Sequence, residues 1–451
     1  MRAGAMRGCA VLTVVLLAAP PLRAAIVAGD AEGAVAPHGL NPFVLAGIAV
    51  IWLVAKICGE IFERLGQPAV LGELLGGIVL GNLALAGWSV AEPLKTDVVI
   101  AALAEIGVII LLFEVGLESN LKEMLEVGWS SLLVATVGVI APFFLGWGVA
   151  AWFIPGEARL AHIFIGATLC ATSVGITARV LKDLGRLKAR EARIILGAAV
   201  IDDVLGLLIL AVVTGAIGAA QTGGDLSTWG IIWIACKALL FLFGAMVVGH
   251  LLVPRLLGGI GRFESRGVLL ALSLAFCFLL AWLARQVGLA EIVGAFAAGL
   301  LLDEVHFEKV PKHEKRDLEE LLRPVSGLLA PIFFVLMGIK VDLRAFARPE
   351  VLGFALLLTV AAIAGKQLCS LGVVERGLNR VAIGFGMIPR GEVGLIFAGI
   401  GATLMLPDAQ GLRQPVINAS IFSAVVIMVI ITTLATPPAL KWALARNIQA
   451  K

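Results

Sequence analysis

Leu196-Gly-Ala-Ala-Val-Ile-Asp-Asp-Val-Leu-Gly-Leu-Leu-Ile-Leu-Ala211 is an apolar stretch whose centre carries two adjacent carboxylates, Asp202 and Asp203. The run that surrounds them is long enough to span a bilayer. One aspartate at the centre of a membrane helix costs about 2.5 to 3.5 kcal/mol on insertion scales. The pair therefore predicts a cavity lined by protein or water, bound protons, or charged partners. We expect it to be the functional site.

The composition of the chain excludes a soluble globule. Of its 451 residues, 60% are hydrophobic and only 15% are charged. Such a composition, divided into repeated apolar blocks, is typical of an all-α polytopic membrane protein. No basic patch suggests that nucleic acid is a partner. The six cysteines are scattered singly, so we expect neither disulfides nor metal clusters. We also expect no cofactor.

About thirteen apolar blocks after Asn41 are predicted to be membrane spans. They cover residues 42–62, 69–86, 97–117, 128–154, 160–181, 192–218, 229–253, 266–285, 288–302, 324–339, 350–374, 378–406 and 416–440. Before them, residues 1–25 have a basic start, a short apolar core and a small-residue exit, which predicts a signal peptide. A retained extra helix is the alternative.

The distribution of Lys and Arg predicts the orientation of the spans. These residues are concentrated in connections at residues 182–193, 255–266, 309–323, 376–380 and 441–451, and the opposite side carries few. The positive-inside rule then places the start of the first span outside and the C-terminus in the cytoplasm. The polar connection at residues 304–323 is expected to form an amphipathic helix at the membrane surface, and no soluble domain is expected beyond the last span.

Two spans carry residues that weaken a helix. Thr172 and Ser173 lie in the first, Ala171-Thr-Ser-Val-Gly-Ile-Thr-Ala-Arg179, although a Ser/Thr-rich packing face is the alternative. The second, Phe385-Gly-Met-Ile-Pro-Arg-Gly-Glu-Val-Gly-Leu395, carries Arg390 and Glu392, which could instead pair and brace the bundle. The two spans run in opposite directions. Together they predict an inverted repeat with two discontinuous helices that cross at the midplane, an architecture of secondary transporters.

Lys366 is a third candidate because it lies too far from either end of its span to reach the membrane surface easily. A buried lysine needs an anion, or it loses its proton. We expect it to pair with Asp202 or Asp203, and an unrelated partner is the alternative.

Five motifs in order carry a resemblance to a known family. They are Arg64-Leu-Gly-Gln-Pro-Ala-Val-Leu-Gly-Glu-Leu-Leu-Gly-Gly-Ile-Val-Leu-Gly81, Leu111-Leu-Phe-Glu-Val-Gly-Leu-Glu118, the Ala171–Arg179 stretch, the Asp202–Asp203 pair, and Pro389-Arg-Gly-Glu-Val-Gly-Leu395. With these motifs the chain resembles bacterial antiporters of the monovalent cation:proton antiporter superfamily, in its Kef-like and Nap-like branch. The likeness covers residues 42–440, which would form a sodium/proton exchanger domain.

The resemblance implies a fold of thirteen helices in two domains and a homodimer in the inner membrane of a bacterium. Spans at 42–117 and 266–339 would form the dimerisation scaffold, those at 128–218 and 350–440 the mobile core, and 229–253 the linker helix. Asp203 would carry the ion or proton, Asp202 would pair with Lys366, and Thr172 and Ser173 would line the site. Arg390 and Glu392 would support the core around it.

The resemblance also implies exchange of a monovalent cation, Na⁺ before K⁺, for H⁺ by an elevator-like alternating-access mechanism, without enzymatic activity. Two adjacent carboxylates place the chain with the electrogenic members. A K⁺/H⁺ antiporter of the potassium-efflux type is the first alternative, and a channel or a non-transporting membrane sensor is a remote one. Kef-type proteins usually carry a nucleotide-binding domain, which this sequence lacks, and its absence weakens gated potassium efflux as an interpretation.

Overall fold

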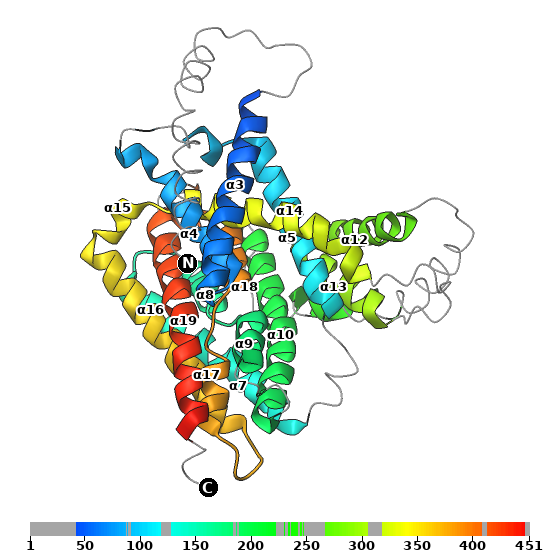
Figure 1. Cartoon of the computed structure of the whole chain (residues 1–451), viewed down its shortest axis with the longest axis vertical. Coiled ribbons are helices and arrows are strands. Elements are labelled where there is room, and N and C mark those ends of the chain that lie inside the picture. The colour runs from blue at the N-terminus through cyan, green and yellow to red at the C-terminus, as the bar shows by residue number, and fades with distance from the viewer. Residues whose placement is uncertain are drawn as a thin grey trace. The chain divides into compact units, whose positions relative to one another are not determined.

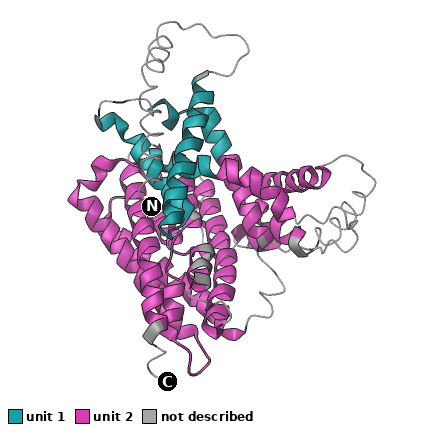
Figure 2. Cartoon of the chain, viewed as in Figure 1, with its two compact units in different colours: residues 1–104, 331–340 teal, residues 105–330, 341–451 magenta. Residues whose placement is uncertain are grey.

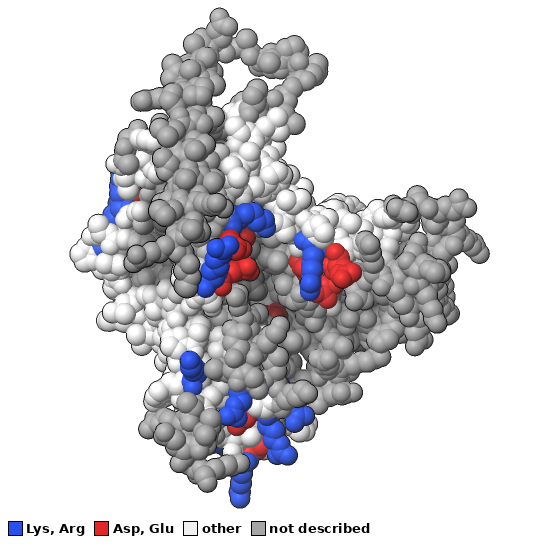
Figure 3. Space-filling model, viewed as in Figure 1, with Lys and Arg blue, Asp and Glu red and all other residues white. Residues whose placement is uncertain are grey.

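The computed structural model describes residues 42–86, 88, 92–118, 128–183, 186, 189–221, 230, 233–234, 236–241, 244–245, 247, 267–304, 318–407 and 413–446. Among these residues, eight helices are long and apolar enough to cross a membrane. Shorter apolar helices lie within Ala69–Leu85, Glu291–Leu302 and Val393–Thr403. The described surface in Figure 3 has wide areas without charge, and its charged side chains gather in a few places. The expected all-α polytopic membrane protein is confirmed.

The chain divides into two compact units (Figure 2). Unit 1 contains residues 1–104 and 331–340, and unit 2 contains residues 105–330 and 341–451. Helices α5 (Val98–Glu118) and α14 (Leu318–Ile339) contribute to both units. The two aspartates and Lys366 belong to unit 2, so the candidate site is built within one unit.

Unit 1 is built on the packing of α3 against α4. Its own elements are α3 (Pro42–Arg64), α4 (Ala69–Gly81), η1 (Leu83–Ala86) and η3 (Pro93–Lys95). Glycines let α4 approach its neighbours closely: a Cβ at Gly72 would lie 2.3 Å from the carbonyl oxygen of Cys58, and one at Gly77 would lie 2.3 Å from that of Val335. Small residues at such contacts are typical of membrane helix packing. This packing accounts for Gly72 and Gly77 of the first motif.

Unit 2 contains the remaining helices and one short hairpin. Its elements are α7 (Trp129–Phe153), α8 (Arg159–Thr168), α9 (Val174–Asp183), α10 (Arg190–Gln221), α12 (Val268–Gln286), α13 (Glu291–Glu304), α15 (Leu343–Phe346), α16 (Pro349–Leu368), η5 (Cys369–Gly372), α17 (Arg380–Gly386), α18 (Glu392–Thr403), β1 (Met405–Pro407), β2 (Arg413–Pro415) and α19 (Ala419–Arg446). The strands are antiparallel, with Leu406 opposite Gln414. Helix α10 contacts α7, α8, α9 and α17, while α19 contacts α9, α16, α17 and α18 (Figure 1).

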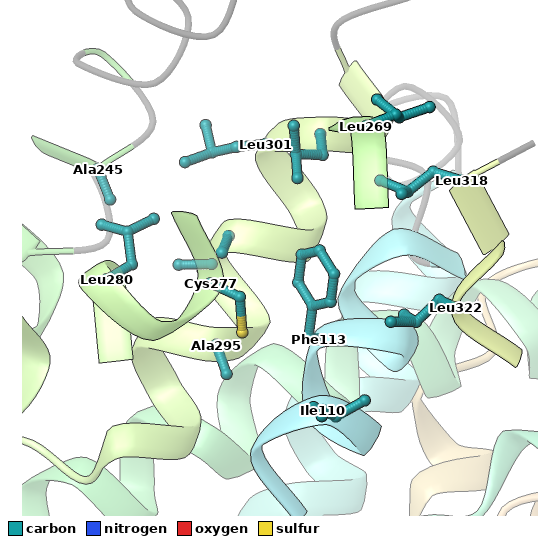
Figure 4. Close-up of a cluster of buried hydrophobic side chains, with 13 residues drawn as sticks. Ile110, Phe113, Ala245, Leu269, Cys277, Leu280, Ala295, Leu301, Leu318 and Leu322 are labelled. Carbon is teal, nitrogen blue, oxygen red and sulfur yellow. The ribbon is translucent and has the colours of Figure 1, made fainter. Parts of the chain in front are cut away.

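A separate apolar core joins α5, α12, α13 and α14 (Figure 4). The Phe113 ring of α5 is fully buried there beside Leu301 and Leu322. The backbone of α13 comes close to α5, because a Cβ at Gly299 would lie 2.1 Å from the Phe113 carbonyl oxygen. The glycine of the second motif, Gly116, meets α13 in the same way. The second motif is therefore a packing surface of this core.

Two asparagines tie the ends of α19 to other segments of unit 2. Asn379 accepts a hydrogen bond from Ala382 N at 3.0 Å, which caps α17, and donates from Nδ2 to the Ala443 carbonyl of α19 at 2.7 Å. At the other end, Asn418 accepts from Ile421 N at 3.0 Å and donates to Glu157 Oε1 at 3.0 Å. Both side chains thus cap one helix and bind a second segment.

The observed bounds correct one expectation. Residues 318–323 were expected in a surface helix, but they form the first turns of the long helix α14, where Leu318 and Leu322 are buried in its apolar core. The apolar residues of these turns therefore belong to the same buried face as the rest of α14. The expected signal peptide at residues 1–25 and most of the linker at 229–253 lie outside the described residues, as does the rest of the polar connection, at 305–317.

Candidate functional site

Helix α10 carries the two aspartates in its interior. Its sequence has no proline, and Glu191 in its first turn matches the positive end of the helix dipole. The side chain of Asp202 is fully buried and that of Asp203 is 6% exposed. Both carboxylates are therefore shielded from solvent.

Lys366 on α16 supplies the positive charge nearest to Asp202. Its Nζ donates to Asp202 Oδ1 at 2.7 Å, and both side chains are 0% exposed. The expected ion pair of Lys366 is thus present, and Asp202 is the partner. Gly138 of α7 lies beside the ammonium group, at a distance where a Cβ would be 3.6 Å from Nζ, an ordinary contact.

The Thr-Ser stretch lies where one helix ends and another begins. Helix α8 ends at Thr168 and α9 begins at Val174, and the residues between them are not helical. Thr172 and Ser173 are each 2% exposed. The Thr172 hydroxyl donates to the Met387 carbonyl at 3.3 Å and lies close to the Asp202 carboxylate. Its hydroxyl therefore reaches the aspartate site.

The Pro-Arg-Gly-Glu stretch forms a similar interruption between α17 and α18. Arg390 is fully buried in it and donates from Nη1 to the carbonyls of Cys170, at 3.3 Å, and Ala171. Thr433 of α19 donates its hydroxyl to the Arg390 carbonyl. The side chain of Glu392 lies outside the described side chains. Arg390 thus binds the backbone of the other interruption.

The two interruptions satisfy each other's backbone groups. Ser173 N donates to the Pro389 carbonyl at 2.9 Å, and next to the interruptions the Thr177 hydroxyl of α9 donates to the Gly386 carbonyl of α17 at 2.6 Å. Gly391 is required at this contact, since a Cβ there would lie 2.6 Å from Ser173 Oγ. Buried backbone groups without partners are costly in a membrane, so this mutual bonding allows non-helical backbone there. We call this pair of interruptions, residues 169–173 and 387–391, the crossing.

The structure brings together most of the residues expected at the site. Asp202, Lys366 and Thr172 are in contact, and Arg390 is an electrostatic neighbour of Asp202. The oxygen atoms available around Asp202 as ligands for a cation belong to carboxylate, hydroxyl and carbonyl groups, which suit hard cations. Sequence reasoning missed Thr433. Its signal was a polar Thr432-Thr433 step in an otherwise apolar span, which is a weak signal because threonine is common in membrane helices.

Comparison with known proteins places the chain in a family. The family model for the sodium/hydrogen exchanger, transmembrane, matches residues 49–446. The chain is 40% identical over 440 residues to the high-affinity Na⁺/H⁺ antiporter NhaS3 of Synechocystis, covering 89% of this chain and 91% of that protein. It is 34% identical over 400 residues to the Na⁺/H⁺-K⁺ antiporter GerN of Bacillus cereus, covering 88% and 95%.

A solved structure supports the same fold. The sodium proton antiporter MjNhaP1 of Methanocaldococcus jannaschii superimposes with a TM-score of 0.67 over 90% of this chain and 97% of that one, at 18% identity. At this identity the likeness concerns the fold alone. The family comprises secondary transporters and not enzymes, as expected. By the extent of the family match and the identity to full-length relatives, the chain belongs to the sodium/hydrogen exchanger family of multi-pass membrane antiporters.

Proposed function

We propose that this protein exchanges Na⁺ for H⁺ across the plasma membrane of a bacterium, with Asp203 and Asp202 as the ion-binding carboxylates. The observation that carries the proposal is the fully buried Lys366–Asp202 ion pair beside Thr172 at the crossing. A charged pair inside an apolar helix bundle is expensive, and in membrane proteins such residues usually mark an ion pathway.

The charges of the site give a reason for exchange. When Asp203 holds a proton, the ionised Asp202, Lys366 and Arg390 give this buried set one net positive charge. A Na⁺ ion that enters would add a second positive charge, which is unfavourable unless the Asp203 proton leaves. Proton and cation therefore compete for Asp203, and competition becomes coupled exchange if the core changes its access only when one of them is bound.

Lys366 gives a route to charge movement. In the absence of metal it binds Asp202, and a Na⁺ ion bound by both carboxylates would displace it. A proton released from Lys366 together with one from Asp203 would mean two protons per cation, so the membrane potential would drive transport as well as the pH gradient. Ser173 and Thr172 would line the cation position, with Arg390 and Glu392 supporting the core.

The finer architecture belongs to the same proposal. Two interrupted helix pairs, α8–α9 and α17–α18, support a fold of thirteen helices with an inverted repeat and an elevator-like movement. Residues 128–218 and 350–440 would form the moving core, residues 42–117 and 266–339 a scaffold that holds a homodimer, and residues 229–253 the linker. The first span would begin outside, and the C-terminus would be cytoplasmic.

K⁺/H⁺ exchange is the second candidate. It is favoured by one relative, whose name as an Na⁺/H⁺-K⁺ antiporter includes potassium. Oxygen donors around Asp202 suit either ion, because ligand type does not discriminate between them. Direct comparison of the two cations distinguishes the candidates.

The test is cation-driven proton flux in proteoliposomes. The purified chain is reconstituted with a pH-sensitive dye inside, Na⁺, Li⁺ or K⁺ is added in turn, and the membrane potential is clamped or left free. We expect Na⁺-driven flux that responds to the potential and is lost in Asp203→Asn. Asp342→Asn is the control, because Asp342 caps the short helix α15 and asparagine is as good a cap. Persistent Na⁺/H⁺ exchange in Asp203→Asn would refute the assignment, and flux with K⁺ alone would favour the second candidate.

A further inference from the structure

We call residues 169–173, which follow α8, the α8 side of the crossing, and residues 386–391, at and after the end of α17, its α17 side. The carbonyls of the α8 side are bonded to a positively charged group. Beyond the end of α8, the carbonyls of Cys170 and Ala171 both accept hydrogen bonds from Arg390 Nη1. Carbonyls at the C-terminal end of a helix carry partial negative charge and are natural ligands for a cation in a broken membrane helix. In this protein a guanidinium group already occupies that position.

The α17 side is covered by neutral groups. The Gly386 carbonyl accepts from the Thr177 hydroxyl at 2.6 Å, and the Met387 carbonyl accepts from the Thr172 hydroxyl at the longer distance of 3.3 Å. A carbonyl oxygen has two lone pairs, and a hydroxyl that donates one hydrogen bond still has lone pairs of its own. Both Met387 O and Thr172 Oγ1 can therefore bind a cation without losing their hydrogen bond.

The burial of Arg390 indicates that its charge has a use beyond hydrogen bonding. The side chain is 0% exposed, and its Nε and Nη2 atoms have no hydrogen-bond partner among the described residues. Unsatisfied donors on a buried cation are destabilising. A neutral amide side chain could donate to the same carbonyls at lower cost, so bonding to them does not by itself account for an arginine.

The surroundings of Arg390 show where that charge acts. The charged groups that interact with it are the Asp202 carboxylate and the Lys366 ammonium. A fixed positive charge at this place attracts the carboxylates and repels any metal cation. Its repulsion is strongest at the carbonyls to which it is bonded.

We infer that Arg390 determines which side of the crossing accepts the transported cation: it excludes the cation from the Cys170 and Ala171 carbonyls and leaves the Thr172 hydroxyl and Met387 carbonyl, beside Asp202, as its neutral ligands. Arg390 is thus a positioning residue that acts through repulsion. The inference rests on the proposed function, since it concerns the ligands of the ion that Asp202 and Asp203 bind.

The test is the dependence of proton flux on Na⁺ concentration in proteoliposomes, at fixed pH and clamped potential. In Arg390→Gln, removal of the repelling charge is expected to lower the apparent KM for Na⁺ by at least about tenfold, while the maximal rate falls. Arg390→Lys keeps the charge and should keep the wild-type KM. Thr432→Val is the control, because it removes a buried hydroxyl that bonds only within α19, to the Met428 carbonyl at 2.9 Å, without changing charge; it should leave KM unchanged.

A second pair of variants tests the α17 side. Thr172→Val removes the proposed hydroxyl ligand and should raise KM for Na⁺ by about tenfold, the size expected for loss of one good polar contact. Thr359→Val, its control, removes another buried hydroxyl, which bonds within α16 to the Ala355 carbonyl at 2.7 Å, and should not change KM.

The results separate this inference from the proposed function. An unchanged or raised KM in Arg390→Gln, or a KM in Arg390→Lys equal to that of Arg390→Gln, would show that Arg390 is only a brace. An unchanged KM in Thr172→Val would remove the α17 side as the binding side. In either case the proposed function stands if wild-type exchange is lost in Asp203→Asn, and it fails if that variant still exchanges.

Discussion

The buried ion pair between Lys366 and Asp202 makes a quantitative prediction about stability. The two side chains are fully buried and 2.7 Å apart, so removal of one partner leaves the other as an uncompensated charge inside unit 2. Breaking a buried pair in this way costs about 3 to 5 kcal/mol. We expect a loss of that size in Lys366→Met, measured at an alkaline pH where carboxylates are ionised. The loss in Asp202→Asn should be smaller, because an unpaired buried Lys366 can release its proton at that pH.

The double variant is the decisive measurement. With both charges gone, the net charge of the buried set is unchanged, because one negative and one positive charge are removed together, and replacement of a buried pair by uncharged residues is often neutral. The double variant should therefore be more stable than either single variant, with a coupling energy of roughly 3 kcal/mol or more. Reversible unfolding of the purified protein in mixed micelles, followed by tryptophan fluorescence, gives the four free energies of unfolding.

An exposed pair provides the control. Arg64 Nε also lies 2.7 Å from Glu60 Oε1, but these side chains are 70% and 55% exposed. Solvent screens such a pair, and its coupling should not exceed about 0.5 kcal/mol. If Lys366→Met and Asp202→Asn were additive in the double variant, like this exposed pair, the reasoning that ties Lys366 to Asp202 would be refuted.

Two further predictions concern transport and folding. Lys366→Met should reduce the charge moved per Na⁺ more than it weakens Na⁺ binding. The charge is measured as current on a solid-supported membrane, and a wild-type current per transported ion would contradict the proposed role of Lys366 in proton release. Gly391→Val should abolish folded protein, because its Cβ would lie 2.6 Å from Ser173 Oγ and would push the two interruptions apart. Gly148→Val should be tolerated, because nothing lies within 4 Å of the added Cβ there. The yield of monodisperse protein in detergent checks both variants.

Composition and spacing were sufficient to predict the class of fold. Membrane-spanning length is a property of the chain itself, so the apolar blocks correspond to helices in the described residues. The one corrected boundary lay in a polar connection, where Leu318 and Leu322 are too few to reveal from sequence that they continue α14. Periodicity in a short charged segment does not distinguish a surface helix from the first turns of a span.

The site was predictable only in part. A lysine and an aspartate deep in apolar spans imply each other by charge, and Lys366 indeed contacts Asp202. The partners of Arg390 could not be read from the sequence, because they are backbone carbonyls of a distant segment and carry no residue-type signal. Thr433, which donates to the Arg390 carbonyl from α19, is likewise recognisable mainly by its contact, whereas Thr177 belongs to the Thr-Ser stretch that the sequence singles out.

The attachment of α19 at three levels has a consequence for the distribution of damaging mutations. Asn379 bonds its C-terminal end to α17, Thr433 bonds its middle to Arg390, and Asn418 bonds its N-terminal end to Glu157, just before α8. Substitutions in the polar turns at either face of the membrane can therefore disturb the same helix that supports the crossing. Loss of transport at these turns would then reflect a misaligned support, and an inherited or engineered defect there could leave every ion ligand intact.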